Sequence, residues 1–373
     1  MPSPFVRVVF ALFLAMLFVP VLAQDTPPGK VVVPFKYENI HSYQNRMALV
    51  KLNGKWGYVD NTGREVIPCK YEVYFSCFGI TEDLACLAEE GWFGFLHKSG
   101  RPAIPFDYHD AWPFAEGRAM VSLDLKWGFI DKAGRVVIPI KYNLVFPFSD
   151  GLAAVMLDDK WGFVDKVGRE IVPRKYEDAD SFREGLAPVR RDKKWGFIDK
   201  TGREVIPCKY RLYEPFHEGL AGVLLNDRLG FIDRTGQEIV PPKYEYDYPG
   251  GRYTEGMALV RLNGKWGFLD RQGREVVPLI YSDADEFDEG LASVQLNDKW
   301  GFINKTGQLV IPNRYDKALS FKEGLAGVKV NGKWGFIDTK GREAIAVAYE
   351  EVLSFSGGLA GAKLNGKWGF IAR

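Results

Sequence analysis

The side chains best suited to chemistry are few and scattered in this 373-residue chain. Its four histidines are His41, His97, His109 and His217. Only His97 and His109 share a neighbourhood, and no serine or cysteine nucleophile motif accompanies them. Acidic residues are abundant, so a pair of catalytic carboxylates stays open on sequence alone. We expect no catalytic residue, no cofactor and no enzymatic activity.

The four cysteines fit no metal-binding template. Cys69 and Cys208 each stand in an Ile-Pro-Cys-Lys-Tyr segment, far apart in the chain, whereas Cys77 and Cys86 lie close together in one irregular segment. An exported protein can form a disulfide between the second pair. The spacing therefore permits a Cys77–Cys86 disulfide and indicates no metal site.

A second set of candidates consists of aromatic side chains that could contact a ligand. Two short insertions, both rich in aromatics, lie within residues 71–83 and 244–255. Insertions in repeat proteins usually fall in loops on one face, often the binding face, although drift in a tolerant loop is an equal alternative. The expected ligand-contact residues are Trp92, Trp112, Tyr246, Tyr248 and Tyr253.

These candidates are positioned by a unit that occurs ten times. Its most regular copy contains Lys-Trp-Gly-Phe-Ile-Asp at 194–199, and successive copies follow at one fixed interval except for two slightly longer steps. That interval, about 34 residues, predicts a repeat array in which each unit buries its apolar face against its neighbours. We expect a structural role for the side chains in the Trp position, which are Trp56, Phe93, Trp127, Trp161, Trp195, Leu229, Trp266, Trp300, Trp334 and Trp368. The glycine that follows each of them is expected to allow packing of the Trp of a neighbouring unit.

Each unit should form three short strands. In the regular copy these are 186–190, 194–199 and 204–207, followed by a connection of about ten residues. The first turn is Asn-Gly in several copies, which favours a type I′ hairpin. In the second turn, Asp199 can accept hydrogen bonds from backbone N–H groups. Pro207 cannot donate to a strand ladder, so the third strand must end there or lie at a sheet edge.

The motif resembles that of the bacterial WG (or KWG) repeat family over nearly the whole chain. The resemblance is carried by Lys-Trp-Gly-Phe-Ile-Asp, by the following Gly-Arg-Glu-Val-Ile-Pro, and by the later Tyr and Glu-Gly-Leu-Ala. It implies a β-repeat fold, an interaction role, frequent export or envelope association, and no catalytic residue. Departures from the pattern are Phe93, Leu229, Asn304 and the segment 344–347.

The ends of the array leave its overall form open. The array begins at Val31 with a strand of the third type and ends at 367–371 with a strand of the second type. This order of strand types at the two ends suits a propeller whose first strand completes the last blade. It suits equally a solenoid whose unit begins with the third strand. Known propellers mostly have about four to eight blades of four strands, for which the unit of this chain is short. We therefore expect an all-β, open superhelical solenoid of three-stranded meanders, with a closed propeller-like ring as the alternative.

The beginning of the chain predicts export. Residues 1–23 have a basic residue, an apolar core of about 12 residues and Val-Leu-Ala before Gln24, as in a cleaved signal peptide. The apolar core is shorter than the ~20 residues of a spanning helix. We expect a signal peptide at 1–23, a short tail at 24–30 and the array at 31–373. The mature protein should have no membrane span and should lie in the periplasm, at the cell envelope or outside the cell.

Charge and composition narrow the class of partner. The chain has 49 basic and 48 acidic residues, and the two signs are interleaved. No basic stripe could follow a phosphate backbone, so nucleic acid is not an expected partner. The sequence favours a non-enzymatic exported scaffold that mediates protein–protein interaction at the envelope. The alternative is binding of a glycan or cell-wall polymer through the loop aromatics.

Overall fold

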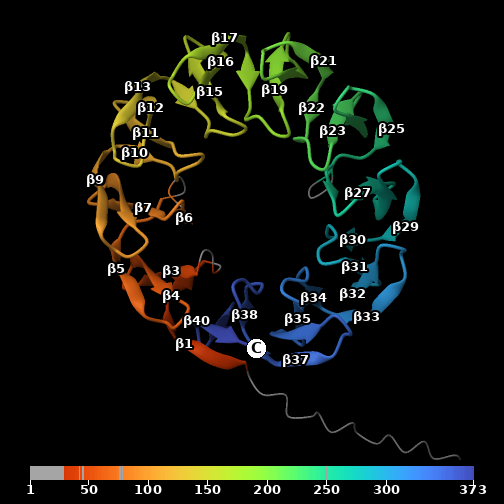
Figure 1. The fold of residues 1–373 in the computed structure, drawn as a ribbon. Coiled ribbons are helices and arrows are strands. Elements are labelled where there is room, and N and C mark those ends of the chain that lie inside the picture. The colour runs from red at the N-terminus through yellow and green to blue at the C-terminus, as the bar shows by residue number, and fades with distance from the viewer. Residues whose placement is uncertain (1–28, 42, 44–45, 75–76, 78, 248–250) are drawn as a thin grey trace, which may run out of the picture.

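The chain forms a closed ring of ten small sheets. A computed structural model describes residues 29–41, 43, 46–74, 77, 79–247 and 251–373. In this part of the chain the regular structure is entirely β, in ten four-stranded antiparallel sheets. Figure 1 shows the sheets as blades around one axis, a ten-bladed β-propeller. The predicted signal peptide at 1–23 and most of the predicted tail at 24–30 lie outside the described residues.

Every blade has four strands, which follow one another outwards from the axis of the ring. Blades 1 to 10 begin with the two-residue inner strands β2 (Asn39–Ile40), β6 (Ile80–Thr81), β10 (Asp110–Ala111), β14 (Leu144–Val145), β18 (Asp178–Ala179), β22 (Leu212–Tyr213), β26 (Tyr253–Thr254), β30 (Asp283–Ala284), β34 (Lys317–Ala318) and β38 (Glu351–Val352). Their second strands are β3 (Met47–Leu52), β7 (Leu84–Glu89), β11 (Ala119–Leu123), β15 (Leu152–Leu157), β19 (Leu186–Arg191), β23 (Leu220–Leu225), β27 (Met257–Leu262), β31 (Leu291–Leu296), β35 (Leu325–Val330) and β39 (Ala360–Leu364).

The third strand carries the Trp-Gly motif and the outer strand forms the rim. The third strands are β4 (Lys55–Asp60), β8 (Trp92–His97), β12 (Lys126–Ile130), β16 (Lys160–Asp165), β20 (Lys194–Asp199), β24 (Arg228–Asp233), β28 (Lys265–Asp270), β32 (Lys299–Asn304), β36 (Lys333–Asp338) and β40 (Lys367–Ala372). The outer strands of blades 1 to 9 are β5 (Glu65–Tyr71), β9 (Pro102–Tyr108), β13 (Val136–Tyr142), β17 (Glu170–Tyr176), β21 (Glu204–Tyr210), β25 (Glu238–Tyr244), β29 (Glu275–Tyr281), β33 (Leu309–Tyr315) and β37 (Glu343–Tyr349), and blade 10 takes β1 (Lys30–Tyr37).

The ring closes between the two ends of the array. Strand β1 pairs with β40 in antiparallel fashion, with Val33 opposite Phe370 and Tyr37 opposite Trp368. Both Val33 and Tyr37 are completely buried. The expected open solenoid is therefore wrong, and the propeller that was the alternative is the fold. The physical reason is that β1 lacks inner strands of its own, so its apolar face is buried only when the last blade supplies them.

The unit also has one strand more than expected. The connection between units contains a two-residue inner strand, such as β18, which pairs with β19. So short a unit can form a four-stranded blade because this strand takes up only two positions. Outer strand β21 continues through Pro207 to Tyr210. Proline is accommodated there because the outer strand has one free edge and needs no donor on that side.

The side chains in the Trp position pack between blades. Trp161 belongs to a buried cluster with Ala187 and Val189 of the next blade, and Leu229 lies in the same way against Ala258 and Val260. The interfaces between blades are therefore the hydrophobic core of the ring.

The glycine after the Trp position has a different role from the one expected. A Cβ placed on Gly196 would come within 2.5 Å of Ile206 O and 2.6 Å of Cys208 N, both in outer strand β21 of the same blade. The register of β20 and β21 shifts at this point. Glycine is required because the bulged outer strand crosses directly over it, and the Trp of a neighbouring unit is not the close contact.

The turn between third and outer strands is held by its aspartate. Asp199 Oδ1 accepts the backbone N–H of Thr201 at 2.9 Å and of Arg203 at 3.1 Å, while Oδ2 accepts from Arg203 Nε at 3.0 Å. The Thr201 hydroxyl is the main cause that lowers the pKa of Asp199 to about 2, followed by these backbone and Arg203 hydrogen bonds acting against desolvation. The pKa of the matching aspartate is also lowered in six other blades, at Asp60, Asp131, Asp165, Asp233, Asp270 and Asp338.

The closure predicts an effect at the far end of the chain. Val33→Asp places an unpaired charge between β1 and its neighbours and should destabilise blade 10 by about 3 kcal/mol or more. Hydrogen exchange should then accelerate in β40, which lies at the opposite end of the sequence. Val31→Asp is the matched control, because Val31 in the same strand is 51% exposed. Unchanged exchange in β40 with Val33→Asp would contradict closure.

The turn aspartates predict a loss of stability in acid. A carboxylate whose pKa is lower in the folded state stabilises the fold above its unfolded pKa of about 3.9, and that stabilisation is lost as the pH falls through the folded value. The Tm should therefore fall between about pH 4 and pH 2. Asp199→Asn should make this fall shallower, since Asn304 accepts the same backbone bonds in blade 8. An unchanged slope, equal to that of the exposed-hairpin control Asp159→Asn, would refute the assignment.

Candidate functional site

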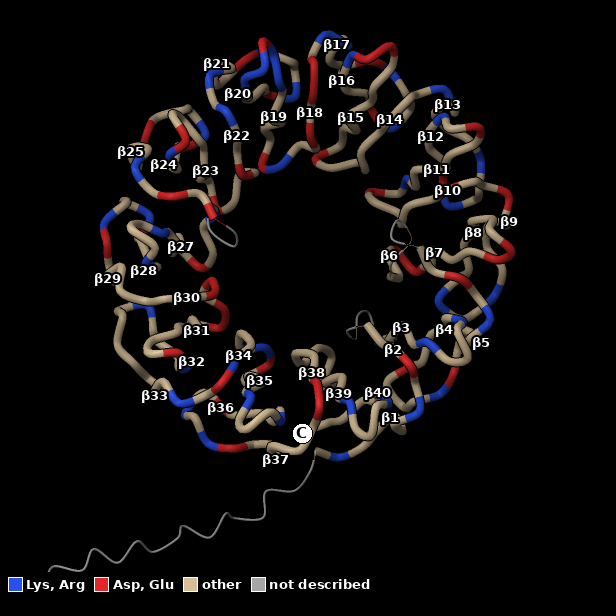
Figure 2. Tube along the Cα trace, turned by 180° about the vertical axis from the view of Figure 1, so that it is seen from behind, with Lys and Arg blue, Asp and Glu red and all other residues tan. Residues whose placement is uncertain are grey.

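Every strand runs between the two faces of the ring, so each site residue can be assigned to one of them. One face carries the hairpin turns between second and third strands, such as Asn53-Gly54, and we call it the hairpin face. The opposite face carries the turns between third and outer strands, such as 199–202, and we call it the Asp-turn face. Figure 2 shows that basic and acidic residues alternate around all ten blades.

On the Asp-turn face, a row of carboxylates links successive blades. Each accepts the backbone N–H of a glycine in the next blade, at 2.7–3.0 Å. This glycine always lies in the turn that leads into the second strand. We call this row the carboxylate ladder, and its members are Glu82, Glu116, Asp150, Glu184, Glu218, Glu255, Glu289 and Glu323. Because their oxygens are engaged in holding the blades together, the ladder is structural.

The closed ring brings the two insertions into a defined relation. They precede the inner strands of blades 2 and 7, which are five blades apart in a ring of ten. They therefore lie on opposite sides of the axis (Figure 1). In both blades the inner strand is displaced along its neighbour: Ile80 pairs with Ala85, and Tyr253 pairs with Ala258. The insertions thus alter the inner edge of the ring at two opposite points.

The insertion of blade 7 is tied down by its own neighbours. Tyr246 is exposed, and its hydroxyl donates to Glu214 Oε1 at 2.6 Å. Burial, with help from this carboxylate, raises the pKa of Tyr246 to about 12. Tyr253 is completely buried and packs edge-on against Phe231, with ring centres 5.0 Å apart. The expected ligand contact by Tyr253 is therefore wrong, because this tyrosine fills the core position that phenylalanine holds in other blades. Tyr248 lies outside the described residues.

Next to this insertion, two carboxyl groups are partly withdrawn from solvent. Burial raises the pKa of both Asp285 and Glu286. Asp285 accepts from Ser293 Oγ at 2.8 Å, and Glu286 lies 3.6 Å from Arg252 Nε. Raised carboxyl pKa values can mark acid–base sites. Asp285 is held by its hydrogen bond, whereas among the described residues Glu286 Oε1 is buried without a hydrogen-bond partner and meets Arg252 only as an ion pair.

On the hairpin face, two blades form the same ion pair from the first residue of the third strand. The first residue of the third strand is Lys or Arg in nine blades, and Trp92 takes this position in blade 2. Lys55 Nζ lies 2.8 Å from Glu72, and Lys299 Nζ lies 2.6 Å from Asp316. In each pair the acid belongs to the connection that leads to the next blade. Charged groups therefore dominate this face.

Blade 2 has an aromatic pair at the two positions that form an ion pair in blades 1 and 8. Trp92 holds the lysine position and His109 holds the acid position, and their ring centres lie 4.8 Å apart. His109 Nδ1 also accepts the backbone N–H of Asp124 in the hairpin of blade 3, at 3.0 Å. A pair of aromatic rings, tilted by 41° to each other, thus stands at one place on this face.

Further apolar side chains surround this pair. Leu125, which follows Asp124, is 89% exposed, Tyr74 is 46% exposed and Trp92 is 43% exposed. Glu72 Oε2 accepts from the Tyr74 hydroxyl at 3.3 Å and from Gly91 N–H at 3.2 Å, so Tyr74 lies beside the hairpin that precedes Trp92. We call Tyr74, Trp92, His109 and Leu125 the aromatic patch.

The remaining predicted residues lie near blade 2 or at the inner edge. Cys77 and Cys86 are bonded in the structure, with Cα atoms 5.2 Å apart, and this bond ties the insertion of blade 2 to β7. Trp112 follows inner strand β10 and is partly exposed. Its N–H donates to Met120 O at 3.0 Å. Trp112 is therefore placed at the inner edge of blade 3.

Sequence reasoning missed three of the four patch residues. Tyr74 lay within one of the two insertions, but His109 and Leu125 carried no signal by themselves. The signal lay in the positions of two residues within the repeat. His109 follows the tyrosine that ends the outer strand, where several other units have an acid, and Trp92 in the same unit stands where the others have Lys or Arg. Comparing units position by position would have paired them.

The described part of the ring contains neither a metal-binding cluster nor a membrane-spanning helix. Across the described ranges, no cluster of three or more His, Cys, Asp or Glu side chains is placed to hold a metal ion. Within those same ranges, the chain has no helix long and apolar enough to cross a membrane.

Solved structures resemble the chain in fold only. A crystal structure described as the eukaryotic initiation factor matches at 10% identity, with a TM-score of 0.50, over 81% of this chain and 95% of that one. AztD from Citrobacter koseri matches at 11% identity with a TM-score of 0.36, over 90% and 96% of the two chains. The second likeness is too distant to support an argument. No curated protein matches.

The family is identified by the repeats themselves. The model of the WG containing repeat matches ten successive segments, 29–56, 56–86, 93–126, 127–161, 161–195, 195–228, 230–266, 266–300, 300–334 and 334–368. These segments cover nearly the whole array and equal the blades in number. The chain belongs to the WG containing repeat family.

Proposed function

We propose that this propeller is a non-enzymatic exported scaffold that binds a protein partner at the cell envelope through its hairpin face. The observation that carries the proposal is the Trp92–His109 pair, with ring centres 4.8 Å apart, on a face where nine blades present a basic residue. Export is supported by the predicted signal peptide.

The composition of the aromatic patch favours a protein over a glycan. Exposed apolar groups gathered among polar ones are typical of interaction sites, and Trp and Tyr are the side chains that most often dominate binding energy. Leu125, at the edge of the patch, offers no hydrogen bond to a sugar hydroxyl. An apolar side chain of a partner would lose its hydration against Trp92 and Leu125, while the surrounding lysines and acids would form a polar rim.

Trp92→Lys tests the patch directly, because lysine is the residue of most other blades at this position. The variant should fold with an unchanged Tm and should capture its partner from envelope extracts about tenfold less well, as the loss of a central Trp commonly does. The measurement is quantitative mass spectrometry of proteins retained by wild type and variant. Lys265→Ala, at the same position in blade 7, is the control and should capture normally.

Two results would contradict the proposal. Equal capture by wild type and Trp92→Lys would show that the patch is not the interface. Retention of peptidoglycan fragments by wild type, lost in Trp92→Lys without any captured protein, would replace the protein partner by a glycan.

A further inference from the structure

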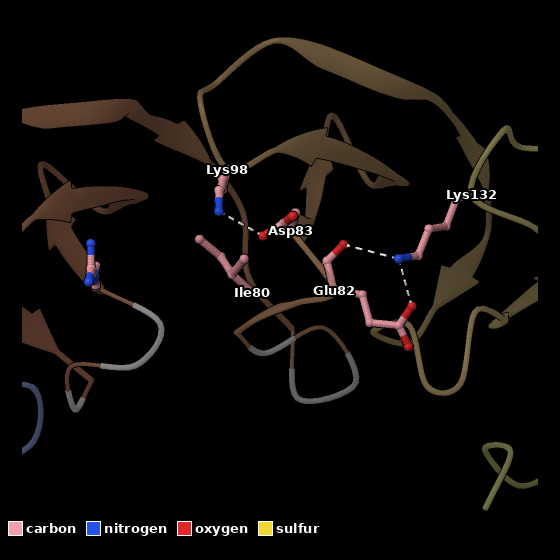
Figure 3. Close-up of a pocket in the computed structure, with 6 residues that line it drawn as sticks. Ile80, Glu82, Asp83, Lys98 and Lys132 are labelled. Atoms are coloured by element: carbon pink, nitrogen blue, oxygen red, sulfur yellow. Dashed lines mark hydrogen bonds and ion pairs between the residues drawn. The ribbon is translucent and has the colours of Figure 1, made fainter.

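The carboxylate ladder is interrupted where the ring closes. Eight blades supply a ladder carboxylate, but the sequence has Asn45 at this position in blade 1 and Gly357 in blade 10. Between blades 10 and 1 the gap is filled, because Ser356 Oγ donates to Tyr43 O and Gly357 lies against the Tyr43 ring. Between blades 1 and 2 the Asp-turn face has a hollow of about 480 Å³, lined by Arg46, Ile80, Glu82, Asp83, Lys98 and Lys132 (Figure 3).

Two of the lining residues replace glycine. The turn residue that leads into the second strand is glycine in eight blades, Gly117, Gly151, Gly185, Gly219, Gly256, Gly290, Gly324 and Gly358, all with positive φ. In blades 1 and 2 it is Arg46, with φ of 63°, and Asp83, with φ of 72°. Non-glycine residues are disfavoured in this conformation. A charged side chain thus takes the place of the turn glycine only on the two sides of this hollow.

The lysines of the hollow show that a ladder carboxylate is missing from blade 1. Lys132 follows the regular pattern, with Nζ 2.9 Å from Glu82, the ladder carboxylate of the preceding blade (Figure 3). Lys166 and Lys305 pair with their preceding ladder residues in the same way. Lys98 holds the equivalent position in blade 2, where the preceding ladder position is Asn45. Its Nζ lies instead 2.8 Å from Asp83 of its own blade (Figure 3).

Arg46 leaves one positive charge unbalanced. Glu82 and Asp83 each have a lysine partner, and the bond from Lys98 is the main cause that lowers the pKa of Asp83. Among the described residues, no carboxylate pairs with the Arg46 guanidinium. The lining of the hollow therefore carries a net charge of about +1, at the one junction without a carboxylate or a substitute for it.

The hollow continues along the same face. A second hollow of about 380 Å³ shares Arg46 and Lys98 and is lined further by Met47, Asp60, Asn61, Arg64, Val66, His97 and Ser99. Its one carboxylate, Asp60, is already paired with Arg64 at 3.0 Å. Because the two hollows share Arg46 and Lys98, they form one continuous groove lined by basic, acidic and apolar side chains. An extended chain segment suits a groove of this form better than a compact ion does.

We propose that this groove binds an acidic peptide segment of a partner, and that a Glu or Asp side chain of that segment takes the missing place in the carboxylate ladder. Arg46 would supply a two-pronged hydrogen bond to the carboxylate, which is the strongest pairing for that group. The backbone N–H of Asp83 holds the position of the glycine donors that ladder carboxylates use elsewhere. This site lies on the face opposite the aromatic patch and does not depend on it.

Replacing Arg46 and Asp83 by glycine should change the affinity for an acidic peptide in opposite directions. Arg46→Gly and Asp83→Gly both introduce the residue found in the other eight blades, so both variants should fold with equal or higher Tm. A fluorescein-labelled hexaglutamate peptide is titrated into the purified protein, and its anisotropy is followed, with hexaglutamine as the neutral control. Arg46→Gly should weaken hexaglutamate binding about tenfold, the usual effect of losing a hydrogen bond to a charged group. Asp83→Gly should strengthen it, because Lys98 is released and a negative charge is removed.

The same titration can overturn the proposal. Changes of the same sign in both variants, or no change with Arg46→Gly, would mean that the two residues only shape the turn. Equal binding of hexaglutamine would exclude recognition of a carboxylate. Trp92→Lys should leave hexaglutamate binding unchanged, so failure here is distinguishable from failure of the hairpin-face proposal.

Discussion

The pairing of β1 with β40 is the interaction on which the rest of the structure depends. It buries Val33 and Tyr37 against the last blade and gives every blade two neighbours. In an array whose units have little core of their own, stability comes from the contacts between units. A single pairing of chain ends therefore supplies a tenth interface and removes the two exposed ends at which an open array would fray.

All ten interfaces share an apolar layer, and eight of them add a hydrogen bond of the carboxylate ladder. In the interior, the side chains of the Trp position and the Phe two residues later pack against the next blade, as Phe163 does against Phe182 with ring centres 4.8 Å apart. Near the Asp-turn face, the carboxylate ladder joins blades 2 to 10 in succession by hydrogen bonds. Because these contacts repeat, a residue that departs from the pattern is easily recognised. A departure that does not disturb the fold calls for an explanation other than folding.

Such departures concentrate in blades 1 to 3. Blade 2 has Trp92 where the other nine blades have a basic residue on the hairpin face, and Asp83 in place of glycine on its Asp-turn face. It also contains the Cys77–Cys86 disulfide and one of the two insertions. Blade 7, on the other side of the axis, has the second insertion but keeps Lys265 and Gly256 at the regular positions. The two insertions are therefore not equivalent, and the surface chemistry of the ring is concentrated on one side.

The fixed period of the unit and the alternation of apolar residues determined the β-repeat fold, the turns and the family, because these depend on contacts within one unit or between adjacent ones. The role of Asp199 and the edge position of the Pro207 strand followed for the same reason. Closure could not be derived, since the phase of the first strand suits an open array and a ring equally. The angle between neighbouring blades decides between them, and it arises from the packing of whole blades. The tertiary structure alone buried Tyr253, brought His109 against Trp92 and placed Arg46 at a gap in the ladder, because each of these depends on contacts between residues of different blades.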